Sequence, residues 1–423
     1  MGENIRNIAI VGGGVAGLTA AHILQRKYAV TLFEKNDYIG GHTHTIVISD
    51  GPDAGIPVDT GFIVMNHRNY PIFTRLLEQL GVELRDSNMS FSYYDERTGL
   101  HYEGSGLNGL FAQRRNLLRP RFYRLVGEIM RFFREASADL AGGGLIDCTL
   151  GQYLEERDYS QDFIRHHVVP MGSAIWSTPC DRMMEFPAES FCSFFSNHGL
   201  LGLKDRPQWK TVNGGSHTYV KRILEGLGGE VRSSAPVSDV VRRDEGVELT
   251  LNGGETRRFD AAIIAAHADE ALAMLRDPST DEKRLLGAWK YECNHTVLHT
   301  DSTVMPPSKR AWASWNYRRE RTAPPDGPAT LSYHMNRLQG LAAQREYFVT
   351  LNRSERLPAE RIIAEMDYDH PTYTRESFAS QAELPGLNGR RRTYFCGSYF
   401  GYGFHEDAVR SAVKVAQSFG LDL

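Results

Sequence analysis

The sequence predicts an α/β fold built on a parallel sheet, and three consecutive segments near the N-terminus support this prediction. Residues 5–11 form a short apolar run of the kind that becomes a buried parallel strand. Residues 15–27 carry apolar side chains at helical spacing, and residues 29–34 return to a strand-like pattern. A strand, a helix and a second strand in close succession form the repeating unit of doubly wound sheets.

A glycine motif, Gly12-x-Gly14-x-x-Gly17, joins the first strand to the helix. Gly12 permits the tight turn, Gly14 lets a pyrophosphate approach the backbone, and Gly17 lets the helix pack close to the strand. The helix begins at Val15 and Ala16, where free N–H groups and a partial positive charge attract phosphate. The motif therefore predicts a dinucleotide site.

Glu34 ends the second strand, at the place where an acid accepts hydrogen bonds from ribose hydroxyls. A second glycine pair, Gly40 and Gly41, follows it and lets the chain pass close to the cofactor again. We therefore expect the neighbouring side chains to contact the cofactor as well: Lys35, His42 and Thr43.

The C-terminal residues 393–412 read as a strand, a glycine-rich loop and a helix that starts near His405 or Glu406. A second helix N-terminus suits the electron-rich N1–C2=O edge of a reduced flavin. Together with the second glycine pair, this loop favours FAD over NAD as the cofactor. We expect the following residues to contact it: Gly397, Ser398, Phe404, His405 and Glu406.

On these motifs the whole chain resembles the flavin-containing amine oxidase superfamily, which also includes carotenoid-type desaturases. Further stretches carry the resemblance: Val58-Asp59-Thr60-Gly61, Trp209 to Gly215, Pro236-Val237 and Cys396-Gly397-Ser398. The resemblance implies FAD contacts from four more residues, namely Thr60, Gly61, Phe62 and Val237.

A narrower resemblance is to FAD-dependent oxidoreductases related to the N-terminal oxidase-like domain of plant cyclopropane fatty acid synthases. It rests on residues 102–115, 170–177 and 401–407.

The resemblance also implies two interleaved domains. A Rossmann-like FAD-binding domain of the glutathione-reductase type would combine residues 1–75, 209–266 and 391–423. An α+β substrate domain would combine residues 76–208 and 267–390. Substrate would then lie between the domains, where clefts favour ligands.

Composition is that of an ordinary globular protein, with 41% apolar and 24% charged residues and a net charge of −4, which argues against nucleic-acid binding. The five cysteines are scattered without CxxC spacing, which predicts neither disulfides nor a metal site. With no apolar run long enough to span a membrane, we expect a cytoplasmic protein, with peripheral contact to the inner face of the membrane as an alternative.

The alternative of membrane contact comes from residues 111–135. This segment contains seven arginines and two glutamates, and its apolar residues recur at helical spacing. One interpretation is an interfacial helix that binds anionic lipid. The other is a helix that faces the core and exposes a basic side to solvent. The sequence leaves both open.

For catalysis we expect Phe404 and Tyr402 near the flavin and His370 near the substrate. Phe404 matches a position of the aromatic cage in amine oxidases, where tyrosine is usual. The lysine that such enzymes place near flavin N5 is missing from residues 291–298, with Lys290 just outside, and no acid follows Gly397 at the usual position. Trp176, Trp312 and Trp315 are assigned to the core.

These departures favour an FAD-dependent oxidoreductase that abstracts hydride from a hydrophobic substrate, first of all a fatty acyl chain, as a desaturase or oxidase. Three alternatives stay open: a flavin amine oxidase, a redox-neutral double-bond isomerase, and a non-catalytic flavin-binding partner of a lipid methyltransferase. The substrate assignment follows from family analogy.

Overall fold

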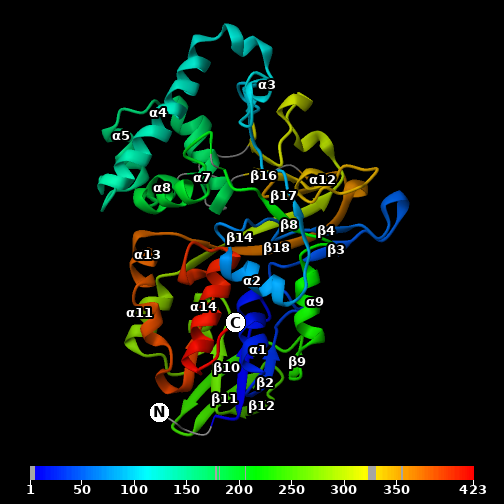
Figure 1. Ribbon diagram of the computed structural model, residues 1–423, viewed down its shortest axis with the longest axis vertical. Coiled ribbons are helices and arrows are strands. Elements are labelled where there is room, and N and C mark those ends of the chain that lie inside the picture. The colour runs from blue at the N-terminus through cyan, green and yellow to red at the C-terminus, as the bar shows by residue number, and fades with distance from the viewer. Residues whose placement is uncertain (1–4, 177–178, 181, 205, 323–329, 354–355) are drawn as a thin grey trace.

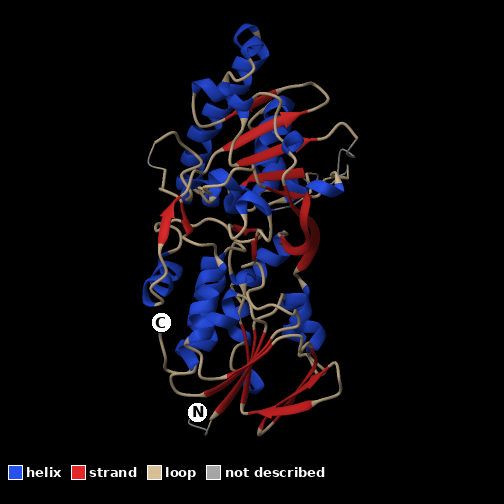
Figure 2. Ribbon diagram, turned by 90° about the vertical axis from the view of Figure 1, so that its right-hand side faces the viewer, coloured by secondary structure: helices blue, strands red, loops and turns tan. Residues whose placement is uncertain are grey.

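The structure is a computed structural model that describes residues 5–176, 179–180, 182–204, 206–322, 330–353 and 356–423. Ser177, the last residue of the stretch 170–177, lies outside the described residues. The molecule is elongated, with a parallel sheet at one end and a cluster of helices at the other (Figure 1). The view turned by 90° shows the strands fanning out at the base and a helical projection at the opposite pole (Figure 2).

The base is a five-stranded parallel sheet in the order β19-β13-β1-β2-β9. Its strands are β1 (Asn7–Val11), β2 (Ala29–Phe33), β9 (Glu230–Arg232), β13 (Ala261–Ile264) and β19 (Thr393–Phe395). Helices α1 (Val15–Leu24), α9 (His217–Glu225) and α14 (His405–Ser418) cover one face, with α1 and α14 side by side (Figure 1).

A three-stranded antiparallel sheet covers the other face of the parallel sheet; its strands are β10 (Val237–Arg243), β11 (Gly246–Leu251) and β12 (Thr256–Phe259). In β1 the side chains alternate accordingly, because Ile8 and Ile10 join the core under the helices while Ala9 and Val11 join the core on the opposite side. Burial on both faces explains why this strand is apolar throughout.

Helices α10 (Ala268–Met274) and α11 (Thr280–Gly287) also lie at this end of the molecule. The guanidinium of Arg242 on β10 donates to Glu282 of α11, and both side chains are buried. This ion pair joins α11 to the three-stranded sheet. The segment that contains α11 follows the predicted domain boundary at residue 267, which stays a prediction.

The other half contains a seven-stranded mixed sheet in the order β18-β14-β17-β16-β15-β6-β7. The strands are β6 (Phe91–Asp95), β7 (His101–Glu103), β14 (Lys290–His299), β15 (Trp315–Arg319), β16 (Thr330–His334), β17 (Phe348–Leu351) and β18 (Ile362–Thr372). Two small ribbons, β3 (Thr45–Val47) with β4 (Pro57–Asp59) and β5 (Leu84–Asp86) with β8 (Lys210–Val212), lie between the halves.

The helices around this sheet come mainly from one stretch of chain. They are α3 (Leu107–Leu110), α4 (Pro120–Gly142), α5 (Leu150–Glu156), α6 (Gln161–Phe163), α7 (Val169–Trp176) and α8 (Ala188–Asn197). Three further helices come from other parts of the chain: α2 (Pro71–Gln79), α12 (Met335–Leu338) and α13 (Arg375–Gln381).

The predicted fold class is confirmed, and the first helix begins at Val15 as expected but ends at Leu24 rather than at residue 27. In the arginine-rich segment, α4 begins only at Pro120. Proline suits the first position of a helix and disfavours helical geometry in the residue before it, so residues 114–118 form a separate 3-10 turn.

Candidate functional site

The carboxyl ends of the parallel strands meet at one edge of the sheet, and a cavity of about 690 Å³ lies there. The loops after β1, β2, β13 and β19 line one side of it. Residues of α8 and of the mixed sheet, mainly from its strand β18, line the rest. Both halves of the molecule therefore contribute to one cavity, as expected for a cofactor that meets its substrate between domains.

The glycine turn at the start of α1 has the geometry that a bound pyrophosphate needs. Gly12 has a φ of +107°, and a Cβ atom there would lie 2.5 Å from the Ala265 carbonyl oxygen. A Cβ on Gly17 would lie 1.9 Å from the Gly12 carbonyl oxygen. A Cβ on Gly14, in contrast, would meet no atom within 4 Å and would project into open space. This space at a helix N-terminus fits a phosphate group.

Glu34 lies on the same edge and is almost completely buried. One carboxylate oxygen accepts from the Gly13 N–H at 2.7 Å and the other from the Asn36 N–H at 2.9 Å. Its neighbour Lys35 donates to Glu270 of α10 at 2.5 Å. Since Glu34 is fixed by two backbone donors at the cavity wall, it is placed to bind ribose hydroxyls.

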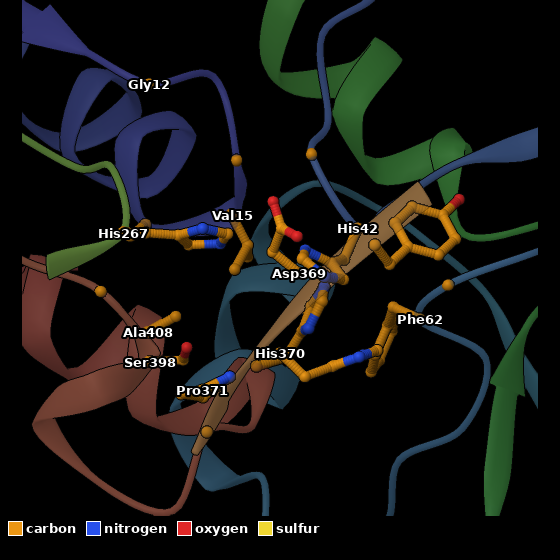
Figure 3. A pocket seen from close by; sticks show the side chains of 18 of the residues that line it. Gly12, Val15, His42, Phe62, His267, Asp369, His370, Pro371, Ser398 and Ala408 are labelled. Carbon is orange, nitrogen blue, oxygen red and sulfur yellow. The ribbon is translucent and has the colours of Figure 1, made fainter. Parts of the chain in front are cut away.

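Three histidine rings gather in the next part of the cavity, from the loop after Gly41, the loop after β13 and strand β18 (Figure 3). The ring of His42 lies 6.0 Å from that of His267 and 5.3 Å from that of His370. Nδ1 of His370 lies 2.9 Å from the amide nitrogen of Asn294, whereas the buried Nε2 of His42 has no hydrogen-bond partner in the described structure.

Burial, together with the proximity of the other imidazoles, lowers the pKa of His42 well below its usual value and that of His370 to about 4. Burial also lowers the pKa of His267. The described lining contains no arginine, and its one lysine, Lys35, is already paired. The positive potential that the described lining offers to a pyrophosphate is therefore mainly that of the N-terminus of α1.

Phe404 lies where α14 begins, and its ring stacks on Phe194 of α8 with centroids 4.9 Å apart. His198 stacks on Phe194 from the next turn of α8, with centroids 3.8 Å apart. Further apolar and aromatic residues line the cavity: Met89, Ile175, Leu200, Trp209, Trp315 and Tyr333. Such a surface suits a hydrophobic substrate beside the flavin.

Most of the predicted site residues line the cavity. They are Gly12, Gly14, Val15, Ala16, Glu34, Lys35, Gly40, Gly41, His42, Gly61, Phe62, Val237, His370, Gly397, Ser398, Phe404 and His405. Phe62 and His405 stack on one another with centroids 3.7 Å apart. Burial lowers the pKa of His405 to about 3, so this ring is neutral near pH 7.

Five predicted residues are absent from the described lining, and among them Glu406 has backbone partners. Glu406 accepts from the Ile72 and Phe73 N–H groups and so fixes the start of α2. Gly17 is packed against the Gly12 carbonyl within the turn. Gly17, Thr43, Thr60, Tyr402 and Glu406 are all absent from the described lining.

Thr43 and Thr60 act on wall residues through hydrogen bonds. The hydroxyl of Thr43 lies 3.0 Å from Nε2 of His405, and that of Thr60 lies 2.7 Å from the Tyr368 hydroxyl. Tyr402, which was expected near the flavin, instead packs its ring 6.2 Å from those of Phe194 and Phe378.

Several wall residues escaped the sequence prediction. Trp315 was assigned to the core, but it lines the cavity, whereas Trp176 is buried and Trp312 packs against Phe348 outside the lining. Phe194 and His198 share one face of a helix, and this spacing was the available signal. His267 directly follows a strand that was predicted to be buried, and the carboxyl ends of such strands carry site residues.

Comparison with known proteins agrees with this site. A family model described as flavin containing amine oxidoreductase matches residues 15–316, more than half of the chain. Polyamine oxidase 2 of Arabidopsis thaliana is 24% identical over 324 residues, which are 71% of this chain and 60% of the plant protein. The match thus covers less than two thirds of that relative's length.

Solved structures show the same fold over nearly the full chain. A putrescine oxidase bound to putrescine has a TM-score of 0.71 at 17% identity and covers 98% of each chain. A fatty acid isomerase from P. acnes has a TM-score of 0.64 at 15% identity and covers 99% of each chain. The narrower resemblance to plant cyclopropane synthases is not addressed by these matches and stays a prediction. The chain belongs to the flavin containing amine oxidoreductase family, and its cofactor is FAD.

Proposed function

We propose that the protein is an FAD-dependent oxidoreductase that removes a hydride from a hydrophobic substrate, with a fatty acyl chain as the first candidate. The observation that carries the proposal is the apolar wall around Phe404. The ring contacts of Phe404 there are with Phe194 and His198, and His198 stacks on Trp209; all four residues line the cavity and none is acidic. A cationic amine would meet no carboxylate in it.

The lining contains four acids, and each interacts with groups other than the rings around Phe404. Glu34 is bound by backbone donors, and Glu270 is paired with Lys35. Asp369 acts electrostatically on Lys35 and His267, and the carboxylate of Asp367 lies 3.1 Å from Nδ1 of His295. The partners of these four acids therefore lie outside the Phe404 wall.

Bound FAD would supply the hydride acceptor, and the chain's own residues would position the substrate and exclude water. The stacked rings of Phe404 and Phe194 form a rigid apolar surface. Burial lowers the pKa of His198 to about 4, so this ring too is neutral near pH 7. An uncharged, dry wall stabilises an acyl chain and leaves a charged substrate without its hydration.

A second candidate is a flavin amine oxidase, favoured by the family and by the aromatic pair at Phe404. The fatty acid isomerase shares the fold, which supports a redox-neutral double-bond isomerase as a further alternative. A non-catalytic role beside a lipid methyltransferase stays a proposal as well. Substrate, activity and partner are thus proposed, on the basis of the cavity.

The test is anaerobic mixing of the FAD-loaded protein with free fatty acids, phospholipids and amines while flavin absorbance is recorded. Bleaching by acyl substrates supports the proposal, and bleaching by amines alone identifies an amine oxidase. A shifted double bond without net bleaching identifies an isomerase. If no substrate reacts and a methyltransferase co-purifies, the non-catalytic alternative is correct.

A further inference from the structure

We propose that residues 104–127 form a docking surface for membranes that contain anionic lipid. This segment, here named the arginine tip, includes α3, the 3-10 turn 114–118 and the first two turns of α4. It lies at the pole of the molecule opposite the parallel sheet, where the chain projects beyond the mixed sheet (Figures 1 and 2). A surface at the end of the long axis can touch a flat membrane without hindrance from the rest of the protein.

The charge of the arginine tip has one sign. Between Glu103 and Glu128 there is no acidic residue, and the tip carries five arginines: Arg114, Arg115, Arg119, Arg121 and Arg124. Of the two bordering acids, Glu103 accepts from the Ser105 N–H at the edge of the tip, and Glu128 accepts from Ser160 outside it. The tip is therefore strongly basic although the whole chain has a net charge of −4.

Most of these arginines have no carboxylate partner. Arg121 forms an ion pair with Asp162. Arg114 donates to the Asn108 side chain and Arg115 to the Gly99 carbonyl, both of which are neutral. Arg119 and Arg124 form no ion pair in the described part of the chain, and the Asp162 carboxylate that pairs with Arg121 also acts electrostatically on Arg124. Guanidinium groups that are exposed and not neutralised are available to lipid phosphates.

Large apolar side chains are exposed among these arginines. Leu118 is 87% exposed and Leu107 is 76% exposed, the two highest values among the exposed large apolar residues of the described chain. Leu117 and Tyr123 are exposed as well. Leucine and tyrosine that alternate with arginine match the composition of interfacial membrane anchors, in which apolar groups enter the acyl boundary and cations bind headgroups.

The tip is held in shape by its inner face, so its exposure does not result from an unfolded loop. Phe122 and Leu125 of α4 are buried in the large core, and the ring of Phe111 packs against that of Phe122. The two interpretations of the basic segment therefore apply to different faces. One side of α4 packs on the core, as expected for a core-facing helix. The tip exposes leucine and arginine to solvent, as expected for a surface that binds lipid. No described helix is long and apolar enough to cross a bilayer, and the proposed contact is peripheral.

The experiment measures binding of the FAD-loaded protein to sedimented vesicles of neutral phosphatidylcholine, with and without phosphatidylglycerol. We expect binding only to the anionic vesicles, and a loss of binding as salt is raised. The triple variant Arg114→Gln, Arg119→Gln, Arg124→Gln should lower the partition coefficient about a hundredfold. A matched control removes equal charge elsewhere: Arg75→Gln, Arg337→Gln, Arg361→Gln.

The apolar contribution is tested separately. Leu117→Ser with Leu118→Ser should weaken partitioning about tenfold or more, whereas Ile146→Ser, which alters another exposed apolar residue, should leave it unchanged. Flavin absorbance and melting temperature verify that each variant is folded.

Equal binding to neutral and anionic vesicles, or equal binding by the tip and control triple variants, would overturn the proposal. Binding of the tip to short DNA or RNA as tight as binding to anionic vesicles would also overturn it, because that result identifies a general polyanion site. The outcome is independent of the substrate, since vesicle binding is measured without turnover.

Discussion

The rings of Phe404 and Phe194 stack with centroids 4.9 Å apart and planes 18° apart. Phe404 starts the last helix of the parallel-sheet half, whereas Phe194 belongs to α8 of the helical cluster. This pair therefore joins the two halves at the cavity wall where we expect the flavin to meet its substrate.

The first prediction concerns this wall. Phe194→Ala should retain FAD but slow flavin reduction by the true substrate about 10- to 100-fold, because the substrate loses a rigid apolar surface that positions it. Phe195→Ala is the matched control, since Phe195 is buried next to it but does not line the cavity. Both changes should lower stability; equal rates in the two variants would contradict the assignment.

Gly14 and Gly17 should respond to substitution in opposite ways. Gly14→Val should give a folded protein without FAD, because its side chain would occupy the open space at the start of α1. Gly17→Ala should give little folded protein, because its Cβ would overlap the Gly12 carbonyl oxygen at 1.9 Å. Circular dichroism reports folding and flavin absorbance reports the cofactor. A yellow Gly14→Val protein would show that the pyrophosphate lies elsewhere.

FAD affinity should increase as the pH is lowered from 8 to 6. Burial holds the pKa of His42 well below its usual value in the free protein, and a nearby pyrophosphate raises it again, so binding takes up protons. We expect Kd to fall as the pH is lowered, by less than about tenfold per pH unit, which is the limit for uptake of one proton. His42→Arg should bind FAD more tightly and with less pH dependence.

The measurement is a fluorescence titration of the apo-protein with FAD. His67→Gln is the control, because His67 is exposed and absent from the described lining. A pH dependence that persists in His42→Arg would assign the proton uptake to His267 or His370.

Acid should destabilise the folded protein below about pH 6.5. Burial lowers the pKa of His167 and of His299 to about 4, whereas the unfolded chain binds protons near the ordinary value, so the stability of the folded state is lost as pH falls from 6.5 to 4. Asp59 acts in the opposite direction, because burial raises its pKa to about 6.

The buried histidines outnumber this acid. Each of them should lower the free energy of unfolding by roughly 1–2 kcal/mol at pH 5. Urea unfolding at pH 7 and pH 5 measures the difference. In His299→Asn the loss between the two pH values should be smaller than in the unaltered protein; an identical loss would exclude His299 as a contributor.

The ion pair between Arg242 and Glu282 should be essential to the parallel-sheet half. Both side chains are buried, at 0% and 4% exposure, so Glu282→Gln leaves a buried guanidinium with less compensation. We expect a loss of about 3–5 kcal/mol in the free energy of unfolding. Glu383→Gln removes the exposed pair with Arg284 and should cost less than about 1 kcal/mol. Similar losses would contradict this account.

Local patterns predict the geometry of the glycine turn and the place of Glu34 beside it. Gly12, Gly17 and Glu34 have roles that depend on their immediate strand and helix, and the structure places them accordingly. Local patterns did not reveal the partners of Glu406, because the N–H groups at the start of α2 come from a distant part of the chain. Trp315 packs against the core as assigned and also lines the cavity, and the sequence pattern of a buried aromatic residue does not distinguish these two roles.

The sequence by itself determined the strand–helix–strand unit, the cofactor class and the basic character of residues 111–135, since each depends on residues close together in the chain. Only the tertiary structure decided which aromatic rings surround Phe404, that His267 joins His42 and His370, and which face of the basic segment is exposed. The physical reason is that walls and surfaces result from packing between elements, and packing partners far apart in sequence leave no periodic signal.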